Sequence, residues 1–378
     1  MRRISLVSQS STILFLGVVL VTLCACSPCD AGTKSEPLVI VQNGKYGFID
    51  HDGKIVIQPQ FLWARDFWRG LGTVYVCGRY LSIDSAGTLL PLRIAIDGKL
   101  EVQQKGDKFG FVDSSGQFGI APTFDEALPF SEGLAAVRSG DKWGFIDTSG
   151  NFVIQPRFTA AYYFREGVST AELDSDSVLI DRSGAVLASQ FQYVDLIAEG
   201  RVPVTQKEKS GYLDLAGKAV IPLIYDGVSP FSEGLAAVEQ GKKWGYVNRD
   251  GKLVIPAKFD QAEMFGSGLA AAKFDGKSGF IDKSGEFAFF LAFDAASGFL
   301  TGDEESNLST APTNVSAFWI DHKFGYVNTA GTVIWGPVNG VPDHPPLFGW
   351  SKNDKVASCD GIPESTKARI ASFPGSSD

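Results

Sequence analysis

The sequence predicts an all-β fold of tandem repeats of about 34 residues, and two observations support this. First, a phrase like that at residues 142–147, Lys-Trp-Gly-Phe-Ile-Asp, occurs nine times. Second, each copy consists of short apolar runs separated by Gly and Pro, which is typical of strands joined by tight turns. A constant period of this size is the signature of units that bury their apolar faces only against neighbouring units. The residues that close the successive phrases are Asp50, Asp84, Asp113, Asp147, Asp181, Asp214, Asn248, Asp282 and Asn328.

Each copy is expected to form a three-stranded meander. In the clearest copy the apolar runs are residues 134–137, 143–146 and 152–154. A Gly-bearing turn separates the first two runs, and a turn with the pattern Asp-x-x-Gly separates the last two. A fourth, short strand is expected within residues 158–164.

Both faces of the middle strand carry residues suited to burial. Because side chains alternate along a strand, Trp143 and Phe145 lie on one face, and Gly144 and Ile146 on the other. A glycine within a strand suits the close approach of a neighbouring backbone or ring. We therefore expect the small sheets to stack face on face. An open, stacked array is favoured over a β-propeller-like ring, because nine repeats exceed the four to eight blades usual for a ring.

The recurring residues resemble those of the WG repeat family, bacterial β-repeat proteins named for their Trp-Gly pair. The resemblance rests on Lys-Trp-Gly-Phe-Ile-Asp, the Gly that follows, Val-Ile-Gln-Pro and Phe-Ser-Glu-Gly-Leu-Ala-Ala-Val, and it extends over residues 38–337. Some copies depart from the pattern: Ser210 and Ser278 replace the Trp, and Ser177-Val178 replaces the pair. The resemblance implies a repeat scaffold and supplies no catalytic residues.

Two polar columns have structural interpretations. The Asp of each Asp-x-x-Gly turn can accept hydrogen bonds from the backbone. We favour this role over metal ligation, since hard cations need several converging oxygens. The basic residue before the aromatic, such as Lys142, would form a stripe along stacked repeats. We interpret this stripe as a solvated strand edge, screened by acidic columns, rather than as a track for an anionic ligand. The acidic residues are Asp147, Glu132, Glu166, Glu199 and Glu233.

Residues 1–25 are expected to be a lipoprotein signal peptide. They begin with Arg2 and Arg3 and continue with an apolar run too short to span a membrane comfortably. Residues 23–26, Leu-Cys-Ala-Cys, resemble a bacterial lipobox, which implies that Cys26 receives diacylglycerol and further acylation (palmitate) as the mature N-terminus. An uncleaved signal anchor is the alternative. Ser27 resembles an outer-membrane sorting signal, so we expect a lipid-anchored protein of the bacterial cell envelope, on the periplasmic or surface face of the outer membrane.

The mature chain is expected to have three parts. Residues 26–37 form a lipidated tether, residues 38–339 the repeat domain, and residues 340–378 an irregular C-terminal cap or tail. The second repeat is shortened between Pro91 and Lys105. An acidic, Ser-rich insertion at residues 302–309 is expected to form a protruding loop.

Charge and cysteine content limit the partners and the bonds. The formal net charge of −9 argues against nucleic acid as the main partner. After processing, Cys29, Cys77 and Cys359 would remain, and an exported protein allows a disulfide. A Cys29–Cys359 bridge would tie the two ends together, although spacing alone does not establish it, and one cysteine is left over.

Residues that could carry catalysis are sparse. The three histidines, His51, His322 and His344, lack the helical spacing of a zinc pair. Residues 276–278, Gly-Lys-Ser, resemble the end of a phosphate-binding loop, but they precede an expected strand. Carboxylates from different repeats could form a glycosidase pair, so a glycan-active enzyme is a distant alternative. We expect no enzymatic activity, no cofactor and no metal.

The sequence thus favours a lipid-anchored envelope scaffold that binds another protein. The alternative is a protein that binds carbohydrate or peptidoglycan through aromatic side chains outside the regular Trp column, which would be freer to face solvent. The residues expected for such a binding surface are Trp63, Trp68, Trp319, Trp335 and Trp350.

Overall fold

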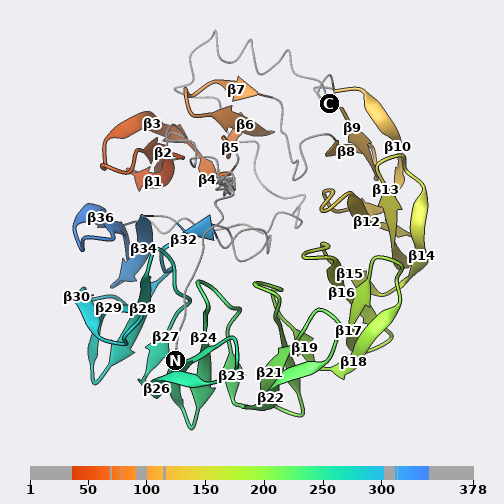
Figure 1. Cartoon of the computed structure of the whole chain (residues 1–378). Helices are drawn as coiled ribbons and strands as arrows, with labels where there is room; N and C mark the ends of the chain where they lie inside the picture. Colours follow the sequence, from red (N-terminus) through yellow and green to blue (C-terminus); the bar gives the residue numbers. More distant parts are fainter. Residues whose placement is uncertain are drawn as a thin grey trace, which may run out of the picture. The chain divides into compact units, whose positions relative to one another are not determined.

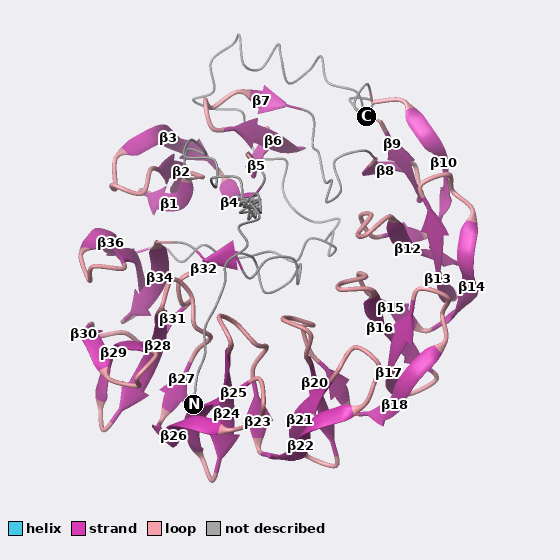
Figure 2. Cartoon of the chain, in the orientation of Figure 1, coloured by secondary structure: helices cyan, strands magenta, loops and turns pink. Residues whose placement is uncertain are grey.

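The computed structural model describes residues 36–68, 70–77, 79–90, 100–113, 116–301, 311–312 and 314–339. All of them belong to the unit Glu36–Asp378. Among these residues there are strands, turns and loops but no helix (Figure 2). The all-β prediction is therefore confirmed.

The described strands form ten antiparallel sheets, and the nine that have three or four strands are called blades 1 to 9 in chain order. Blade 1 comprises β1 (Leu38–Gln42), β2 (Lys45–Ile49) and β3 (Ile55–Phe61). Blade 2 comprises β4 (Trp63–Trp68), β5 (Leu71–Val76), β6 (Arg79–Asp84) and β7 (Leu89–Leu90). Blade 3 comprises β8 (Glu101–Lys105), β9 (Lys108–Val112) and β10 (Phe118–Phe124). Blade 4 comprises β11 (Glu126–Ala127), β12 (Leu134–Ser139), β13 (Lys142–Asp147) and β14 (Phe152–Phe158). Blade 5 comprises β15 (Ala160–Ala161), β16 (Val168–Leu173), β17 (Asp176–Asp181) and β18 (Val186–Phe191). Blade 6 comprises β19 (Tyr193–Val194), β20 (Val202–Gln206), β21 (Lys209–Leu213) and β22 (Ala219–Tyr225). Blade 7 comprises β23 (Gly227–Val228), β24 (Leu235–Gln240), β25 (Lys243–Asn248) and β26 (Leu253–Phe259). Blade 8 comprises β27 (Gln261–Ala262), β28 (Leu269–Phe274), β29 (Lys277–Asp282) and β30 (Phe287–Phe290). Blade 9 comprises β31 (Ala295–Ala296), β34 (Val315–Ile320), β35 (Lys323–Asn328) and β36 (Val333–Asn339).

The predicted meander and its short fourth strand are both present. The short strand β15 follows β14 in the chain, but it pairs with β16 and so begins the next blade. A separate two-stranded pair, β32 (Leu300–Thr301) with β33 (Ala311–Pro312), flanks the acidic insertion expected at residues 302–309. The insertion itself lies outside the described residues.

The blades follow one another around a ring (Figure 1). Blades 1 and 9 share a hydrophobic cluster, in which Ile40 and Ile49 pack against Phe324 and Tyr326. The Tyr326 hydroxyl also donates a hydrogen bond to the Val39 carbonyl at 3.0 Å. The expected open array is wrong, because the apolar faces of the first and last sheets meet each other instead of ending at solvent. The alternative, a β-propeller ring, is confirmed.

A recurring aromatic pair joins neighbouring blades. Phe145 of the middle strand of blade 4 contacts Phe164 of blade 5, with ring centroids 4.9 Å apart. On the opposite face, Ile146 packs into the cluster shared with blade 3. Both faces of the sheet are therefore buried, as the alternation of side chains predicts. Equivalent ring pairs with centroids 4.7–5.0 Å apart are Phe48–Phe67, Phe111–Phe130, Tyr212–Phe231, Tyr246–Phe265 and Phe280–Phe299.

The glycine of the Trp-Gly pair allows the third strand to approach closely. A Cβ on Gly144 would lie 2.5 Å from the Ile154 carbonyl oxygen and 2.8 Å from the Pro156 nitrogen. Blade 5 has Val178 at this position, and its third strand β18 is one residue shorter than β14. In blade 4 the strand β14 bulges where it passes Gly144. The corresponding bulge of β18 opposite Val178 in blade 5 is smaller.

The seam between blades 2 and 3 differs from the others. Each of the other eight seams holds a hydrophobic cluster, but none of the clusters among the described residues joins these two blades. The Asp-x-x-Gly glycine of blade 3, Gly116, has open space around the position of a Cβ, whereas Gly150 faces Ile120 of the preceding blade. The connection at residues 91–99, where the sequence predicts a shortened repeat, lies outside the described residues.

Replacing Phe164 by Ala should destabilise the ring strongly, because Phe164 is 1% exposed and fills a seam. Deleting a buried Phe side chain costs about 3–5 kcal/mol in free energy of unfolding. Tyr162→Ala, in the same segment but 43% exposed, is the matched control and should change the free energy of unfolding by about 0.5 kcal/mol. Urea denaturation followed by fluorescence measures both. Equal effects of the two substitutions would contradict the seam-packing account.

Candidate functional site

The repeated Asp column caps turns. Asp147 Oδ1 accepts hydrogen bonds from the backbone N–H groups of Ser149 and Asn151, both at 2.9 Å. These bonds, that from Asn151 first, hold the pKa of Asp147 below its usual value. The same pattern recurs at the equivalent Asp and Asn residues, which confirms the turn-capping interpretation. Within the described residues, no group of three or more His, Cys, Asp or Glu side chains could hold a metal ion.

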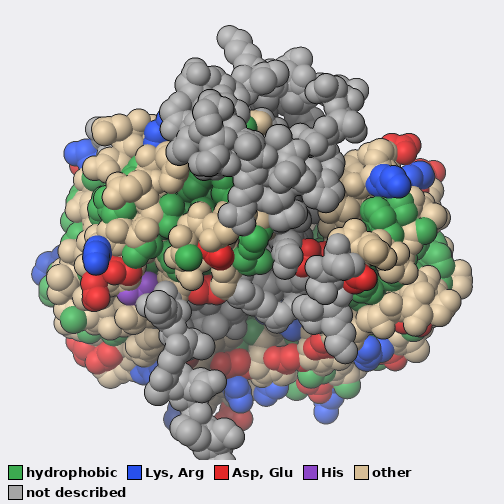
Figure 3. Space-filling model, turned by 90° about the horizontal axis from the view of Figure 1, so that it is seen from above, with side chains coloured by type: hydrophobic (Ala, Val, Ile, Leu, Met, Phe, Trp, Pro, Cys, Tyr) green, Lys and Arg blue, Asp and Glu red, His purple; other side chains and the backbone are tan. Residues whose placement is uncertain are grey.

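Three lysines of the basic column form ion pairs with acidic residues across the seams. Lys209 of blade 6 bonds Asp226, which opens blade 7, at 2.6 Å. Asp226 also accepts a hydrogen bond from the Gly241 N–H at 2.8 Å, and its pKa is lowered by Lys209 first and by Gly241 second. Lys108–Asp125 and Lys243–Asp260 repeat this pair. Charges of both signs are interspersed on the face seen in Figure 3, so the observed pairs fit the interpretation of a screened strand edge.

The repeated Glu-Gly pairs form a second set of links between blades. Glu199 accepts a hydrogen bond at 3.0 Å from the N–H of Gly234 in the next blade, and it pairs with Arg249 at 2.8 Å. The same Glu-to-Gly bond occurs at Glu36–Gly70, Glu132–Gly167, Glu166–Gly200 and Glu233–Gly268. Sequence reasoning treated glutamates of this set as an acidic column that screens the basic stripe, but missed that they bond the next blade. Their 34-residue recurrence together with the Gly was the available signal.

An apolar column lies on the last long strand of several blades. In the Val-Ile-Gln-Pro segment the Ile is buried and the preceding Val points outward. Val56, Val153, Val220 and Val254 occupy this same register and are 37–47% exposed. These strands run along the outside of the ring in Figure 1.

The structure places the tryptophans of the expected binding surface differently from one another. Trp63 is only 9% exposed and packs in the core shared by blades 1 and 2, which differs from the expected solvent exposure. Trp319 is partly buried against Phe324, with ring centroids 5.4 Å apart. Trp335 packs against the same blade 1/9 cluster as Trp319, so the structure brings these two together. The side chain of Trp68 and all of Trp350 lie outside the described residues.

A hollow of about 310 Å³ lies where Ser210 replaces the repeat's Trp, at the seam of blades 6 and 7. Tyr193, in the adjacent strand β19, is 58% exposed beside it. The lining also includes the carboxylates of Asp195, Glu208 and Asp226. Burial raises the pKa of Asp195.

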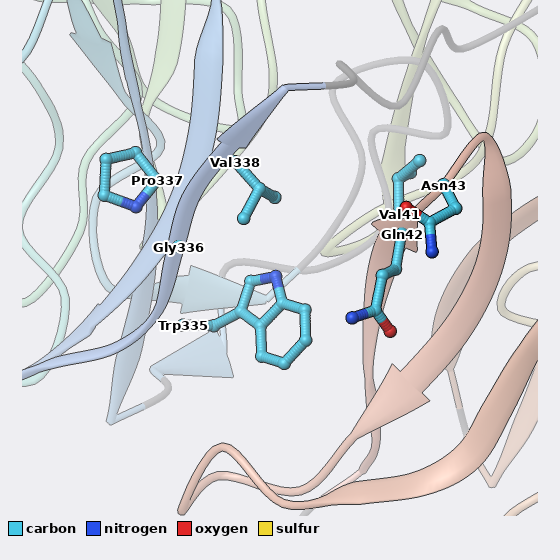
Figure 4. A pocket seen from close by; sticks show the side chains of 7 residues that line it. All are labelled: Val41, Gln42, Asn43, Trp335, Gly336, Pro337 and Val338. Carbon is cyan, nitrogen blue, oxygen red and sulfur yellow. The ribbon is translucent and has the colours of Figure 1, made fainter.

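A second hollow, of about 430 Å³, opens at the seam of blades 9 and 1 (Figure 4). Its walls are the β1–β2 hairpin, with Gln42 and Asn43, and the strand β36, with Trp335. The indole Nε1 of Trp335 is buried and has no hydrogen-bond partner among the described residues. Sequence reasoning singled out Trp335 but missed the hairpin opposite it, because the two segments are almost 300 residues apart.

The histidines and the Gly-Lys-Ser segment have structural surroundings. His51 bonds Asn314 Oδ1 at 2.5 Å and the Glu36 carbonyl at 3.0 Å. His322 lies in the β34–β35 turn with a φ of 59°. Lys277 and Ser278 begin β29, as expected for a segment that precedes a strand. His344 lies outside the described residues.

The predicted signal peptide, Cys26, the tether up to Ser35 and the C-terminal region from residue 340 also lie outside the described residues. In the part of the chain that is described, no helix is long and apolar enough to span a membrane. Cys77 is disulfide-bonded, whereas the pairing considered from the sequence, Cys29–Cys359, did not include it. The other four cysteines, including the expected Cys29–Cys359 pair, are not among the described residues.

Comparisons with known proteins support the repeat assignment. Residues 46–76, 109–143, 143–175, 211–244 and 244–277 match the family model described as WG containing repeat, so the resemblance is confirmed for these five stretches. No curated protein matches the chain.

Several solved structures are similar in fold. A crystal structure described as the eukaryotic initiation factor is 11% identical, with a TM-score of 0.53 over 79% of this chain and 94% of that chain. BamB from Moraxella catarrhalis is 10% identical, with a TM-score of 0.33 over 78% and 92% of the two chains. AztD from Citrobacter koseri is 11% identical, with a TM-score of 0.35 over 79% and 92%. Of these three, the first bears on the fold, and at such low identity it indicates nothing further.

The Asp226 pair predicts a specific dependence of stability on pH. Because the folded-state pKa of Asp226 lies below its ordinary value of 3.8, its contribution to stability is present above about pH 4 and is lost as the pH falls through the lowered folded pKa. Asp226→Asn should therefore make the acid-side loss of stability shallower. Thermal unfolding between about pH 2 and 7 measures this, with Asp141→Asn, in an exposed hairpin turn, as the control. Parallel pH profiles for Asp226→Asn and the wild type would refute it.

Proposed function

We propose that this WG-repeat β-propeller is a lipid-anchored scaffold of the cell envelope that binds another protein. The observation that carries the proposal is the apolar column formed by Val56, Val153, Val220 and Val254. An isolated exposed valine needs no explanation. The same side chain exposed at the same register of blades 1, 4, 6 and 7, however, offers equivalent apolar contacts at several points along the outside of the ring.

The arrangement of the polar side chains supports binding at the valine column over a catalytic role for the ionisable residues. The recurring carboxylates already accept backbone hydrogen bonds or pair with basic residues across the seams, as at Asp226 and Glu199. The oxygen lone pairs of these carboxylates are therefore used in bonds that hold neighbouring blades together. The acidic balance of the chain disfavours nucleic acid as the partner.

The lipid anchor rests on the sequence. Arg2 and Arg3, the apolar run at residues 13–23 and the lipobox-like residues 23–26 occur in the order of a bacterial lipoprotein signal. An anchor at Cys26 would leave residues 27–37 as a short tether before the first blade. Outer-membrane placement is supported by Ser27, and the partner would then be another envelope protein.

A photo-crosslinking amino acid at Val153 or Val254 should capture a defined partner in intact cells, because both side chains lie in the exposed column. Tyr162, which is exposed to a similar degree but lies on a different segment, is the matched control position. We expect one shared band from the two valine positions and none from Tyr162. The same bands from all three positions, or none from the valines, would refute the proposed surface.

Cys26→Ser should abolish incorporation of labelled palmitate and leave the precursor with its signal peptide uncleaved, since the thiol that accepts the lipid is lost. Cys29→Ser is the control and should be labelled as the wild type. Metabolic labelling and the electrophoretic mobility of the mature protein measure this outcome. Continued lipid labelling of the Cys26→Ser protein would contradict the assigned anchor.

A further inference from the structure

The hollow between blades 9 and 1 lies where the repeat pattern is broken. Trp335 pairs with Tyr326 in the same register in which Ile154 pairs with Phe145. At the blade 4/5 seam this Ile faces the next turn glycine, with its Cγ2 2.9 Å from a Cβ built on Gly184. At the closing seam, Gly53 instead faces the Ile334 carbonyl. At this seam a backbone carbonyl packs against the turn glycine, so the side chain of Trp335 is not needed for that contact.

The indole of Trp335 presents an aromatic ring at this hollow. It lies between the two blades, opposite the β1–β2 hairpin (Figure 4). Its Nε1 is removed from solvent and has no acceptor among the described residues. Because solvent does not reach Nε1, a molecule in the hollow would contact the carbon atoms of the indole ring.

The opposite wall supplies neutral amide groups. Gln42 and Asn43 both line the hollow and are exposed, and each side chain can donate and accept hydrogen bonds. Asn43 has a φ of 54° at the hairpin position that Gly140 occupies in blade 4. The remaining lining residues are Val41, Gly336, Pro337 and Val338, so no ionisable side chain among the described residues lines the hollow.

We propose that this hollow binds a neutral saccharide. The apolar face of a sugar ring would pack on the Trp335 indole, and the sugar hydroxyls would bond the side-chain amides of Gln42 and Asn43. The volume of about 430 Å³ falls within the range of about 300–1,000 Å³ for small-molecule sites. The absence of a charged group from the lining favours an uncharged sugar over an anionic one. This proposal goes beyond the protein-binding function and does not depend on the valine column.

Titration calorimetry of the mature protein with cellotriose and N-acetylglucosamine trimer tests the site, with trigalacturonate as the anionic comparison. We expect saturable binding of at least one neutral trisaccharide and none of trigalacturonate. Trp335→Ile, which removes the indole ring and installs the residue that blade 4 has in this register, should weaken binding at least about fivefold. Asn43→Gly, which installs the blade 4 residue and suits a positive φ, should weaken it similarly. Trp244→Phe, in blade 7, is the control and should bind as the wild type.

Three outcomes would overturn the proposal. They are no binding of either neutral sugar at about 10 mM, binding of trigalacturonate alone, and unchanged affinity in both Trp335→Ile and Asn43→Gly. A thermal melt of each variant establishes that the ring is folded. Because the crosslinks at Val153 and Val254 do not involve the hollow, they would persist if the saccharide site failed, so the two proposals fail separately.

Discussion

The ring depends on one aromatic contact that is repeated from blade to blade. In six of the nine blades the middle strand carries a Phe or Tyr whose partner ring belongs to the following blade, as Phe145 does with Phe164. A blade of at most four short strands cannot enclose such a ring by itself. Each blade is therefore stable only between two neighbours, and the last blade needs the first. Tyr326, which bonds Val39 and packs on Ile40, provides this final contact.

The polar columns follow from the same dependence between neighbours. Glu199 bonds Gly234 of the next blade, and Lys209 bonds Asp226 of the next blade. Exposed ion pairs contribute little individually, but here each one also orients a turn through a backbone N–H, as Asp226 does with Gly241. The recurrence of charged residues therefore reflects the geometry of the seams and gives no evidence of a catalytic centre.

Local features were predictable from the sequence, and long-range ones were not. The strands, the capped turns and the need for Gly144 follow from alternation, turn chemistry and the close approach of the Pro-containing strand. Ring closure depends on the cumulative angle between blades and on contacts such as Phe324 with Ile40, which are almost 300 residues apart. The same limit applies to Trp63: no periodic pattern shows that the core of blades 1 and 2 encloses it.

Departures from the repeat correspond to specific local changes. Where Val178 replaces the strand glycine, the third strand loses a residue and the seam remains filled. Where Ser210 replaces the Trp, a hollow opens beside Tyr193. Where Trp335 replaces the Ile, a second hollow opens beside Asn43. The side chains of the consensus residues pack or bond between neighbouring blades. We therefore expect ligand-binding side chains at positions that depart from the repeat. In a ring of similar blades, such positions also make one seam chemically distinct from the others.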